Sequence, residues 1–281
     1  MAEPSTAQDV WERMAAVLRR SVPKQQFETW FRGMRLVSLE PERVELSVPN
    51  NFLREWILKR YANVLRTAIR EITGSDPAVD RLRLSVDEWG IVREWDPKPD
   101  GPGVGIYEVY YTLGDGIANA RALHELIRAA DLVEIAQWAQ TVNIIGAIKT
   151  SRTHASMGPV GHFLALYRAR VGGDVAPTSL SSNAPLDVVA ARDEEKKILS
   201  LGLINYSPRE DVAVNLDVRG GGDFQTIRGW RITGPGLDAI NVPGRPEEVV
   251  TTELPHGLAL DQPVVLPRHS ITVVEMIEAR P

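Results

Sequence analysis

The sequence predicts a multidomain chain of mixed α+β and α/β class. We expect a small α+β N-terminal domain, a segment of a partial (β/α) barrel and a C-terminal antiparallel β-sandwich. Three observations support this: apolar residues at helical spacing early in the chain, a strand–helix–strand order after them, and short alternating runs towards the end. We place the three domains at residues 1–78, 79–173 and 174–281.

Composition excludes several classes of protein. The chain has 281 residues, of which 43% are hydrophobic and 25% charged, as in ordinary globular proteins. No apolar run reaches the roughly 18 residues of a membrane span, and the N-terminus lacks the basic start and apolar core of a signal peptide, so we expect a cytoplasmic protein. There are no cysteines, and the five histidines show no ligand-like spacing. We therefore expect no metal and no cofactor.

The net charge of -5 is unevenly distributed. Residues 1–75 hold 12 Lys/Arg against 9 Asp/Glu, a balance of +3. The remainder holds 20 against 28, a balance of -8. An acidic remainder gives little support for phosphate contacts, so we expect no direct binding of nucleic acid and no membrane contact.

The first 75 residues predict a compact α+β unit. Apolar residues at three- and four-residue steps predict helices, and two short apolar runs separated by a Glu-Pro-Glu turn predict strands. Gly74 is expected to end the last helix. The expected helices are residues 8–21, 24–33 and 52–72, and the expected strands are 34–39 and 44–48.

The middle of the chain begins with an alternating strand, residues 82–90 (LRLSVDEWG). Its two-residue period places Glu88 on the same side as Leu84 and Val86, so we expect the strand end to deliver a carboxylate into an enclosed space, as barrel enzymes do. A surface loop is expected at 95–105. After it we expect helices at 111–128, 131–139 and 160–170, and a buried strand at 142–148.

The last part of the chain alternates apolar and polar residues in short runs spaced by glycine, proline and asparagine. This pattern is typical of an antiparallel β-sandwich. The expected strands are residues 186–190, 198–205, 213–218, 225–233, 249–254, 263–266 and 271–277.

The N-terminal region resembles the N-terminal domain of the bacterial replication initiator DnaA. The resemblance covers residues 8–74 and rests on the FETWF segment at 27–31, on LSVPNNF at 46–52 and on the helix that follows. It implies an interaction module that contacts the replicative helicase or another initiator copy, with Trp11 near the self-association surface and Phe52 near the helicase-facing one. The initiator's ATPase is absent, because GPGVG at 101–105 is not followed by the Lys-Ser/Thr of a phosphate loop.

From residue 82 onwards the chain resembles the C-terminal part of an α-L-arabinofuranosidase of glycoside hydrolase family 51. Four blocks in order carry the resemblance: DEWG at 87–90, YTLGD at 111–115, AQTVN at 139–143 and LPRHSITV at 266–273. Such enzymes cleave terminal arabinofuranosides with retention, using one carboxylate as nucleophile and another as acid/base. The resemblance implies that Glu88 is the nucleophile and that Gln140 and Trp89 bind the substrate, an arabinofuranoside-containing oligosaccharide.

The sequence also departs from this family. The family usually has an aromatic residue four positions after its nucleophile, where this chain has Val92; Trp95 is a candidate substitute. The family's acid/base lies in an Asn-Glu pair, and these 281 residues contain no Asn-Glu dipeptide. A complete barrel takes about 250 residues, and residues 79–173 supply roughly two of its eight strand–helix units. The sequence therefore leaves open whether the chain is an enzyme.

Three functions stay open at this point. The chain could be a glycosidase that works only when another polypeptide completes the barrel, an interaction module of the initiator type, or a fusion of two gene fragments without evolved joint function. The strand at 82–90 is either the last strand of the initiator-like domain or the first strand of the barrel. We also expect exposed apolar edges at Leu84, Val86, Val142 and Ile144, and hence a tendency to oligomerise or aggregate.

Overall fold

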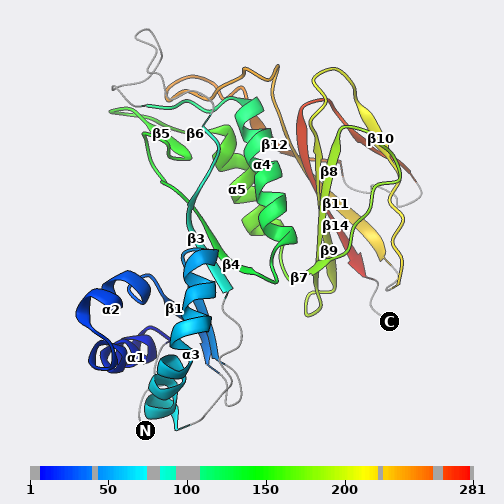
Figure 1. Ribbon diagram of the computed structural model, residues 1–281. Coiled ribbons are helices and arrows are strands. Elements are labelled where there is room, and N and C mark those ends of the chain that lie inside the picture. The colour runs from blue at the N-terminus through cyan, green and yellow to red at the C-terminus, as the bar shows by residue number, and fades with distance from the viewer. Residues whose placement is uncertain are drawn as a thin grey trace, which may run out of the picture. The chain divides into compact units, whose positions relative to one another are not determined.

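The computed structural model describes residues 7–39, 44–74, 83–92, 108–220, 224–255 and 262–278 (Figure 1). The chain divides into two compact units. Unit 1 comprises Met1–Trp89 and Ala129–Gln137, and unit 2 comprises Gly90–Arg128 and Trp138–Pro281. The three-domain division stays a prediction, and the predicted loop at 95–105, including Trp95, lies outside the described residues.

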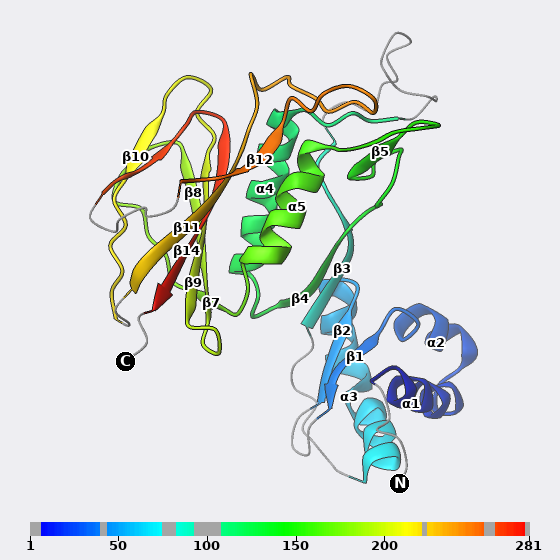
Figure 2. The same cartoon turned by 180° about the vertical axis from the view of Figure 1, so that it is seen from behind.

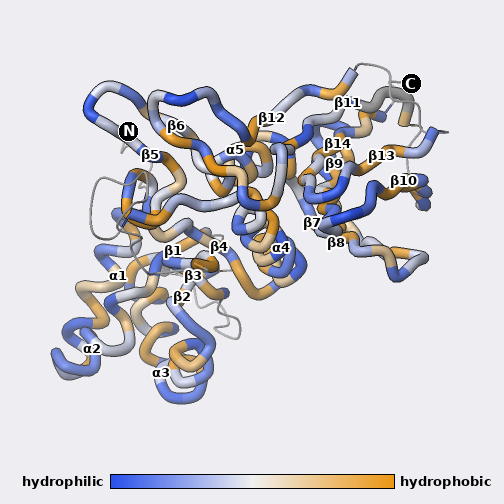
Figure 3. The backbone as a smooth tube through the Cα atoms, turned by 90° about the horizontal axis from the view of Figure 1, so that it is seen from above, coloured by the Kyte–Doolittle hydropathy of each residue, from blue (hydrophilic) through white to orange (hydrophobic). Residues whose placement is uncertain are grey.

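Unit 1 contains the three helices predicted for the N-terminal region. They are α1 (Ala7–Ser21), α2 (Lys24–Trp30) and α3 (Asn51–Thr73). Asn50 caps α3, because its side-chain oxygen accepts a hydrogen bond from the N–H of Leu53 at 2.9 Å. Gly74 ends the helix with a φ of 72°, a left-handed conformation that favours glycine. Figure 3 shows hydrophobic and hydrophilic residues alternating along α1 and α3, as expected of helices with one buried face.

A four-stranded sheet completes unit 1. Its order is β1 (Arg35–Leu39), β2 (Val44–Val48), β3 (Arg83–Trp89) and β4 (Val133–Trp138). Strands β1 and β2 are antiparallel, whereas β2 and β3 are parallel. The prediction of a helix at 131–139 is wrong. This segment forms β4, because pairing beside β3 overrides its local helical pattern.

Unit 2 contains two long helices, α4 (Leu113–Arg128) and α5 (Pro159–Arg170), close to their predicted bounds. A small hairpin of β5 (Ile148–Thr150) and β6 (Ala155–Met157) precedes α5. The predicted buried strand at 142–148 is wrong. Asn143 and Ile144 adopt φ angles of 55° and 50°, so the chain turns there instead of extending.

The C-terminal strands form two antiparallel sheets, which confirms the predicted β-sandwich. The larger sheet has the order β12-β11-β14-β9-β8-β7, and the smaller one pairs β10 with β13. Helices α4 and α5 pack against the larger sheet, as Figures 1 and 2 show from opposite sides. The strands are β7 (Asp174–Ala176), β8 (Leu186–Asp193), β9 (Ile198–Asn205), β10 (Val212–Val214), β11 (Phe224–Thr233), β12 (Val250–Glu253), β13 (Val264–Leu266) and β14 (Ser270–Glu278).

The predicted exposure of apolar edges holds for two of four residues. Val142 and Ile144 are 48% and 44% exposed. Leu84 and Val86 are half-buried, because β3 has a neighbour on each side. Among the described residues, no helix is both long and apolar enough to cross a membrane. Oligomerisation stays a prediction.

Candidate functional site

Glu88 lies near the end of β3, and its side chain is exposed. It does lie on the same side of the strand as Leu84 and Val86, as the alternation predicts. That side is not the enclosed one, however. Ser85, on the opposite side, is 1% exposed and donates a hydrogen bond to Asp87 at 2.6 Å. The expectation that the strand delivers Glu88 into an enclosed space is therefore wrong for this structure.

The chain just after Trp89 is held by a buried asparagine. Asn119 of α4 is fully buried; its side-chain oxygen accepts from the N–H of Ile91 at 2.6 Å, and its amide donates to the Ile91 carbonyl at 3.0 Å. Gly90 has a φ of 144°, and a Cβ there would lie 2.8 Å from the ring of Trp138. Only glycine fits this approach. Asn119 is not among the residues predicted for the site, although it is a polar residue on the apolar face of the predicted helix.

The YTLGD block forms the start of α4. The Asp115 carboxylate accepts hydrogen bonds from the Thr112 N–H at 2.9 Å and the Thr112 hydroxyl at 2.8 Å. In return, the Asp115 N–H donates to the Thr112 hydroxyl at 3.1 Å. This reciprocal arrangement is a capping box with aspartate in place of glutamate. The block therefore has a clear structural role in beginning the helix.

Gln140 is exposed, in the turn that connects β4 to β5. The turn is closed by Asn143, whose side-chain oxygen accepts from the Thr150 N–H at 2.8 Å and whose amide donates to the Thr150 hydroxyl at 2.9 Å. Glu88 belongs to unit 1 and Gln140 to unit 2. Trp89, the third residue predicted to bind substrate, is half-buried.

A buried ion pair fixes the same turn. Lys149 is 1% exposed, and its amine lies 2.9 Å from the Glu108 carboxylate and donates to the Ile144 carbonyl at 2.9 Å. Glu108 also accepts from the Ile144 N–H at 3.0 Å. Burial lowers the pKa of Lys149, although Glu108 favours its charged form. The pair thus holds both backbone groups of Ile144, a β-branched residue in the strained left-handed region.

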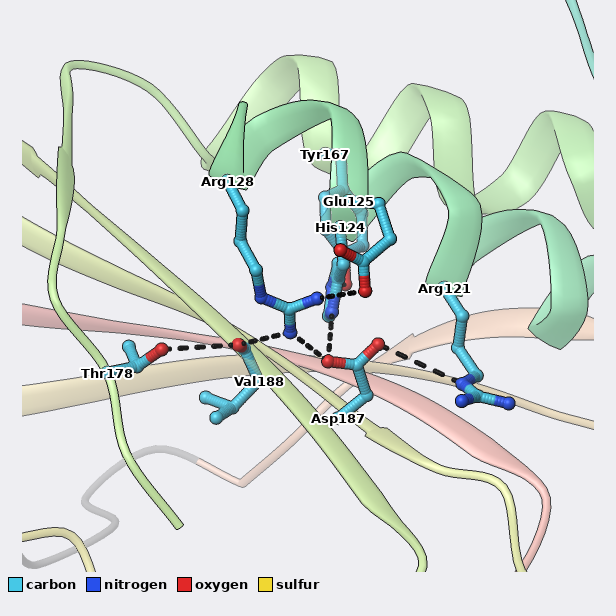
Figure 4. A network of polar contacts seen from close by, with 8 residues as sticks. All are labelled: Arg121, His124, Glu125, Arg128, Tyr167, Thr178, Asp187 and Val188. Atoms are coloured by element: carbon cyan, nitrogen blue, oxygen red, sulfur yellow. Dashed lines mark hydrogen bonds and ion pairs between the residues drawn. The ribbon is translucent and has the colours of Figure 1, made fainter. Parts of the chain in front are cut away.

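A second buried network joins the helices to the larger sheet (Figure 4). His124 of α4 lies 3.4 Å from the Asp187 carboxylate of β8 and 2.6 Å from the hydroxyl of Tyr167 in α5. Arg128 contacts the same carboxylate and donates to the Val188 carbonyl at 2.9 Å. His124 is fully buried and Tyr167 is 3% exposed, so no substrate reaches this trio. We interpret it as a structural tie.

The electrostatics of this network follow from burial and hydrogen bonding. Burial lowers the pKa of His124, although Asp187 opposes the shift. For Asp187 burial raises the pKa, but hydrogen bonds from His124 and Arg128 outweigh it and hold the pKa below its usual value. Burial raises the pKa of Tyr167. The hydroxyl therefore stays protonated and donates to the neutral imidazole.

The lowered pKa of His124 predicts acid sensitivity. An unfolded histidine titrates near about 6.5, and the folded one at lower pH, so below about 6.5 the unfolded state binds more protons. Stability is therefore complete above this value and falls as the pH drops, by up to about 1.4 kcal/mol per pH unit. The titratable and charged side chains around the ring are Arg121, Glu125, Arg128, Tyr167 and Asp187.

Urea unfolding at pH 7.5 and 5.5 measures this effect. The loss between the two pH values should be smaller in His124→Gln, which has no titrating ring, than in the unchanged chain; His162 and His269, whose pKa values burial also lowers, remain in both proteins. Equal losses in the two proteins would show that His124 does not carry the acid sensitivity.

The two aromatic residues predicted to mediate protein contacts differ in exposure. Trp11 is half-buried and packs against the core of unit 1. Phe52 is 66% exposed and stacks on Trp56 at a ring distance of 6.1 Å, with Trp30 5.4 Å from Trp56. Arg60 lies over Trp56 at 5.0 Å. We call Trp30, Phe52, Trp56 and Arg60 the aromatic patch.

Within the described ranges, no group of three or more histidine, aspartate or glutamate side chains could hold a metal ion. The geometry therefore offers a carboxylate on an exposed strand end, a turn held by buried polar groups, and an aromatic patch in which Phe52 is exposed and Trp30 and Trp56 are half-buried.

Two family models match this chain. The model of the DnaA N-terminal domain matches residues 8–71, and that of the alpha-L-arabinofuranosidase C-terminal domain matches residues 87–270. Both resemblances predicted from the sequence are confirmed. The second match spans more than half of the chain.

Solved structures of family 51 alpha-L-arabinofuranosidases share this fold. The thermostable enzyme from Thermotoga petrophila RKU-1 is 23% identical, with a TM-score of 0.59 over 78% of this chain and 48% of that one. The Thermotoga maritima enzyme, solved as an arabinose complex, is 24% identical, with a TM-score of 0.58 over 80% and 48%. The Xanthomonas axonopodis pv. citri enzyme is 20% identical, with a TM-score of 0.58 over 80% and 46%. This chain thus spans about half the length of these proteins.

Proposed function

This chain belongs to the alpha-L-arabinofuranosidase C-terminal domain family, and we propose that Glu88 occupies the nucleophile position of a retaining arabinofuranosidase. We also propose that the chain does not hydrolyse arabinofuranosides alone. Its substrate class, when a barrel is completed, is an arabinofuranoside-containing oligosaccharide. Gln140 and Trp89 are its proposed substrate contacts. No cofactor is required for this chemistry, and we place the protein in the cytoplasm.

The exposure of Glu88 carries the proposal. A retaining glycosidase holds two carboxyl groups about 5 to 5.5 Å apart across the scissile bond, inside a pocket that positions the sugar. Here the strand end that bears Glu88 faces solvent. The Asn-Glu pair that supplies the acid/base in the family is missing from these 281 residues. Loss of general acid catalysis alone costs about a hundred- to ten-thousand-fold in rate.

Hydrolysis of an aryl arabinofuranoside tests this proposal. We expect the purified chain to show no turnover above that of Glu88→Gln, which keeps the size of the side chain but removes its nucleophilic oxygen. Turnover that disappears in Glu88→Gln would contradict the proposed inactivity and establish Glu88 as catalytic.

A second candidate function is supported by the aromatic patch. Exposed aromatic side chains beside an arginine are frequent hot spots of protein interfaces. We propose that the patch, with Phe52 at its exposed end, contacts a replicative helicase, and that Trp11 lies near a surface for a second initiator copy.

Binding of purified helicase to the full chain tests this second function. Phe52→Ala should weaken binding at least about ten-fold, a typical hot-spot effect. Leu39→Ala is the matched control, because Leu39 is 39% exposed and lies outside the patch. Equal affinities for both variants, or no binding of the unchanged chain at micromolar concentration, would exclude the patch as a helicase site.

A further inference from the structure

Strand β3 connects the regions of the two family matches. It spans Arg83–Trp89, whereas the matches end at residue 71 and begin at residue 87. On one side it pairs with β2, inside the DnaA-type match, and on the other it neighbours β4, inside the arabinofuranosidase match. The sequence left open to which of the two regions this strand belongs. In the structure, β3 lies in one sheet with a strand from each region.

A charged ladder crosses the same three strands. Arg83 of β3 lies 3.7 Å from the Glu45 carboxylate of β2 and also forms an ion pair with Glu134 of β4. The three side chains are only 25%, 17% and 22% exposed, so solvent screens them less than an open surface pair. Arg83 lies outside both matches, yet it pairs with one carboxylate from each. Arg83 therefore connects the two matched regions through ion pairs with Glu45 and Glu134.

We propose that β2 is an edge cap, which occupies the side of β3 where a barrel places its preceding strand. In a (β/α) barrel every strand is parallel to its neighbours and pairs with the strand before it and the strand after it. Here β4 follows β3 along the chain, and β2 lies on the other side in the same parallel sense, with Ser47 opposite Arg83 and Val48 opposite Leu84.

The edge cap determines how a barrel could be completed. The start of β3 already pairs with β2, so a polypeptide that supplied the preceding strand could not form the same hydrogen bonds. It would have to displace β2 together with α3, which begins at Asn51. The initiator-like region thus excludes a barrel-completing partner from the strand that bears Glu88. This inference rests on the proposed role of β3 as the nucleophile strand.

Disulfide trapping tests the strand pairing. The chain has no cysteine, so Val48→Cys/Leu84→Cys creates a single pair of thiols in register on neighbouring strands. Adjacent strands lie about 4.8 Å apart, within disulfide range, and we expect the pair to oxidise almost completely under mild conditions. Leu36→Cys/Leu84→Cys is the control, because β1 and β3 are separated by β2, and it should stay reduced.

Hydrogen exchange on the unchanged chain gives a second reading that needs no variant. The amide of Leu84 donates to the Leu132 carbonyl at 2.7 Å, on the β4 side. Because successive amides of a strand point to opposite edges, the amides of Arg83 and Ser85 face β2 and should exchange slowly when β2 pairs with β3. Failure of the Val48/Leu84 thiols to pair, or exchange of β3 amides as fast as in exposed loops, would overturn the edge cap.

The consequence for partners is tested with a probe polypeptide carrying the six preceding strand–helix units of a family 51 barrel. Arg83→Ala, which has no cysteine and whose ladder is broken, should bind the probe at least ten-fold more tightly than the oxidised Val48→Cys/Leu84→Cys protein. Equal binding would overturn the exclusion. Arabinofuranoside hydrolysis in the same samples tests the enzyme proposal separately. If the probe binds but no hydrolysis follows, the proposed role of Glu88 as nucleophile is contradicted, whereas the edge-cap proposal is not.

Discussion

Replacing Asp187 by alanine is expected to lower the free energy of unfolding by about 2 to 4 kcal/mol. The carboxylate accepts contacts from His124 and Arg128, and its loss leaves the buried imidazole N–H without its acceptor and the guanidinium with only the exposed Glu125 as a counter-ion. Breaking a fully buried ion pair typically costs about 3 to 5 kcal/mol, and we expect less here because the Arg128 side chain is 37% exposed. Urea unfolding at pH 7.5 measures the change.

Glu125→Ala is the matched control for this prediction. Glu125 pairs with the same arginine at 2.7 Å, but its side chain is 74% exposed. Removing such a surface partner typically costs only about 0 to 1 kcal/mol. Equal losses for Asp187→Ala and Glu125→Ala would show that burial does not govern this network and that α4 is held to the sheet by apolar packing alone.

Local patterns predicted the helices and the sandwich strands well. The apolar spacing of α1, α3 and α4 is one-sided enough to give their positions, and glycine and asparagine mark the ends of α3. The sandwich strands alternate in short runs between turn residues, which predicted seven of the eight strands described there; the short β7 was not predicted. These features depend only on residues near one another in the sequence.

Two elements were mispredicted because distant partners decide them. Residues 133–138 form β4 beside β3, although their spacing favours a helix. Residues 142–148 have the β-branched content of a strand, but the Lys149–Glu108 pair and Asn143 hold them in a turn. Sequence spacing does not reveal an ion pair between residues that lie 41 positions apart.

The geometry of the candidate site could be predicted only in part. The motif blocks led to Glu88, and the two-residue period gave the correct side of its strand. Its exposure did not follow from the sequence, because the enclosed face of the sheet is set by the strands and helices that pack on it. Asn119 and Asp187 were missed for the same reason: their hydrogen-bond partners come from distant elements.

The largest expected effect is the loss of catalysis itself. An aryl arabinofuranoside with a dinitrophenyl leaving group needs little protonation to depart, so it removes the requirement for an acid/base carboxylate and tests the proposed lack of a sugar-binding pocket by itself. Positioning the sugar against the nucleophile is a separate and large contribution to rate. The measured quantity is the rate of hydrolysis with this chain divided by the rate in buffer. We expect this ratio to be no larger for the activated substrate than for a less reactive aryl glycoside.

The central claim is that Glu88 retains the family's nucleophile position without its activity. The most direct measurement is the rate of dinitrophenyl arabinofuranoside hydrolysis by the purified chain and by Glu88→Gln, with a complete family 51 enzyme as positive control. We predict equal rates for the two proteins, within about two-fold, and no covalent glycosyl adduct on Glu88 by intact-protein mass spectrometry. A rate at least about ten-fold above Glu88→Gln, together with an adduct on Glu88, would contradict the claim.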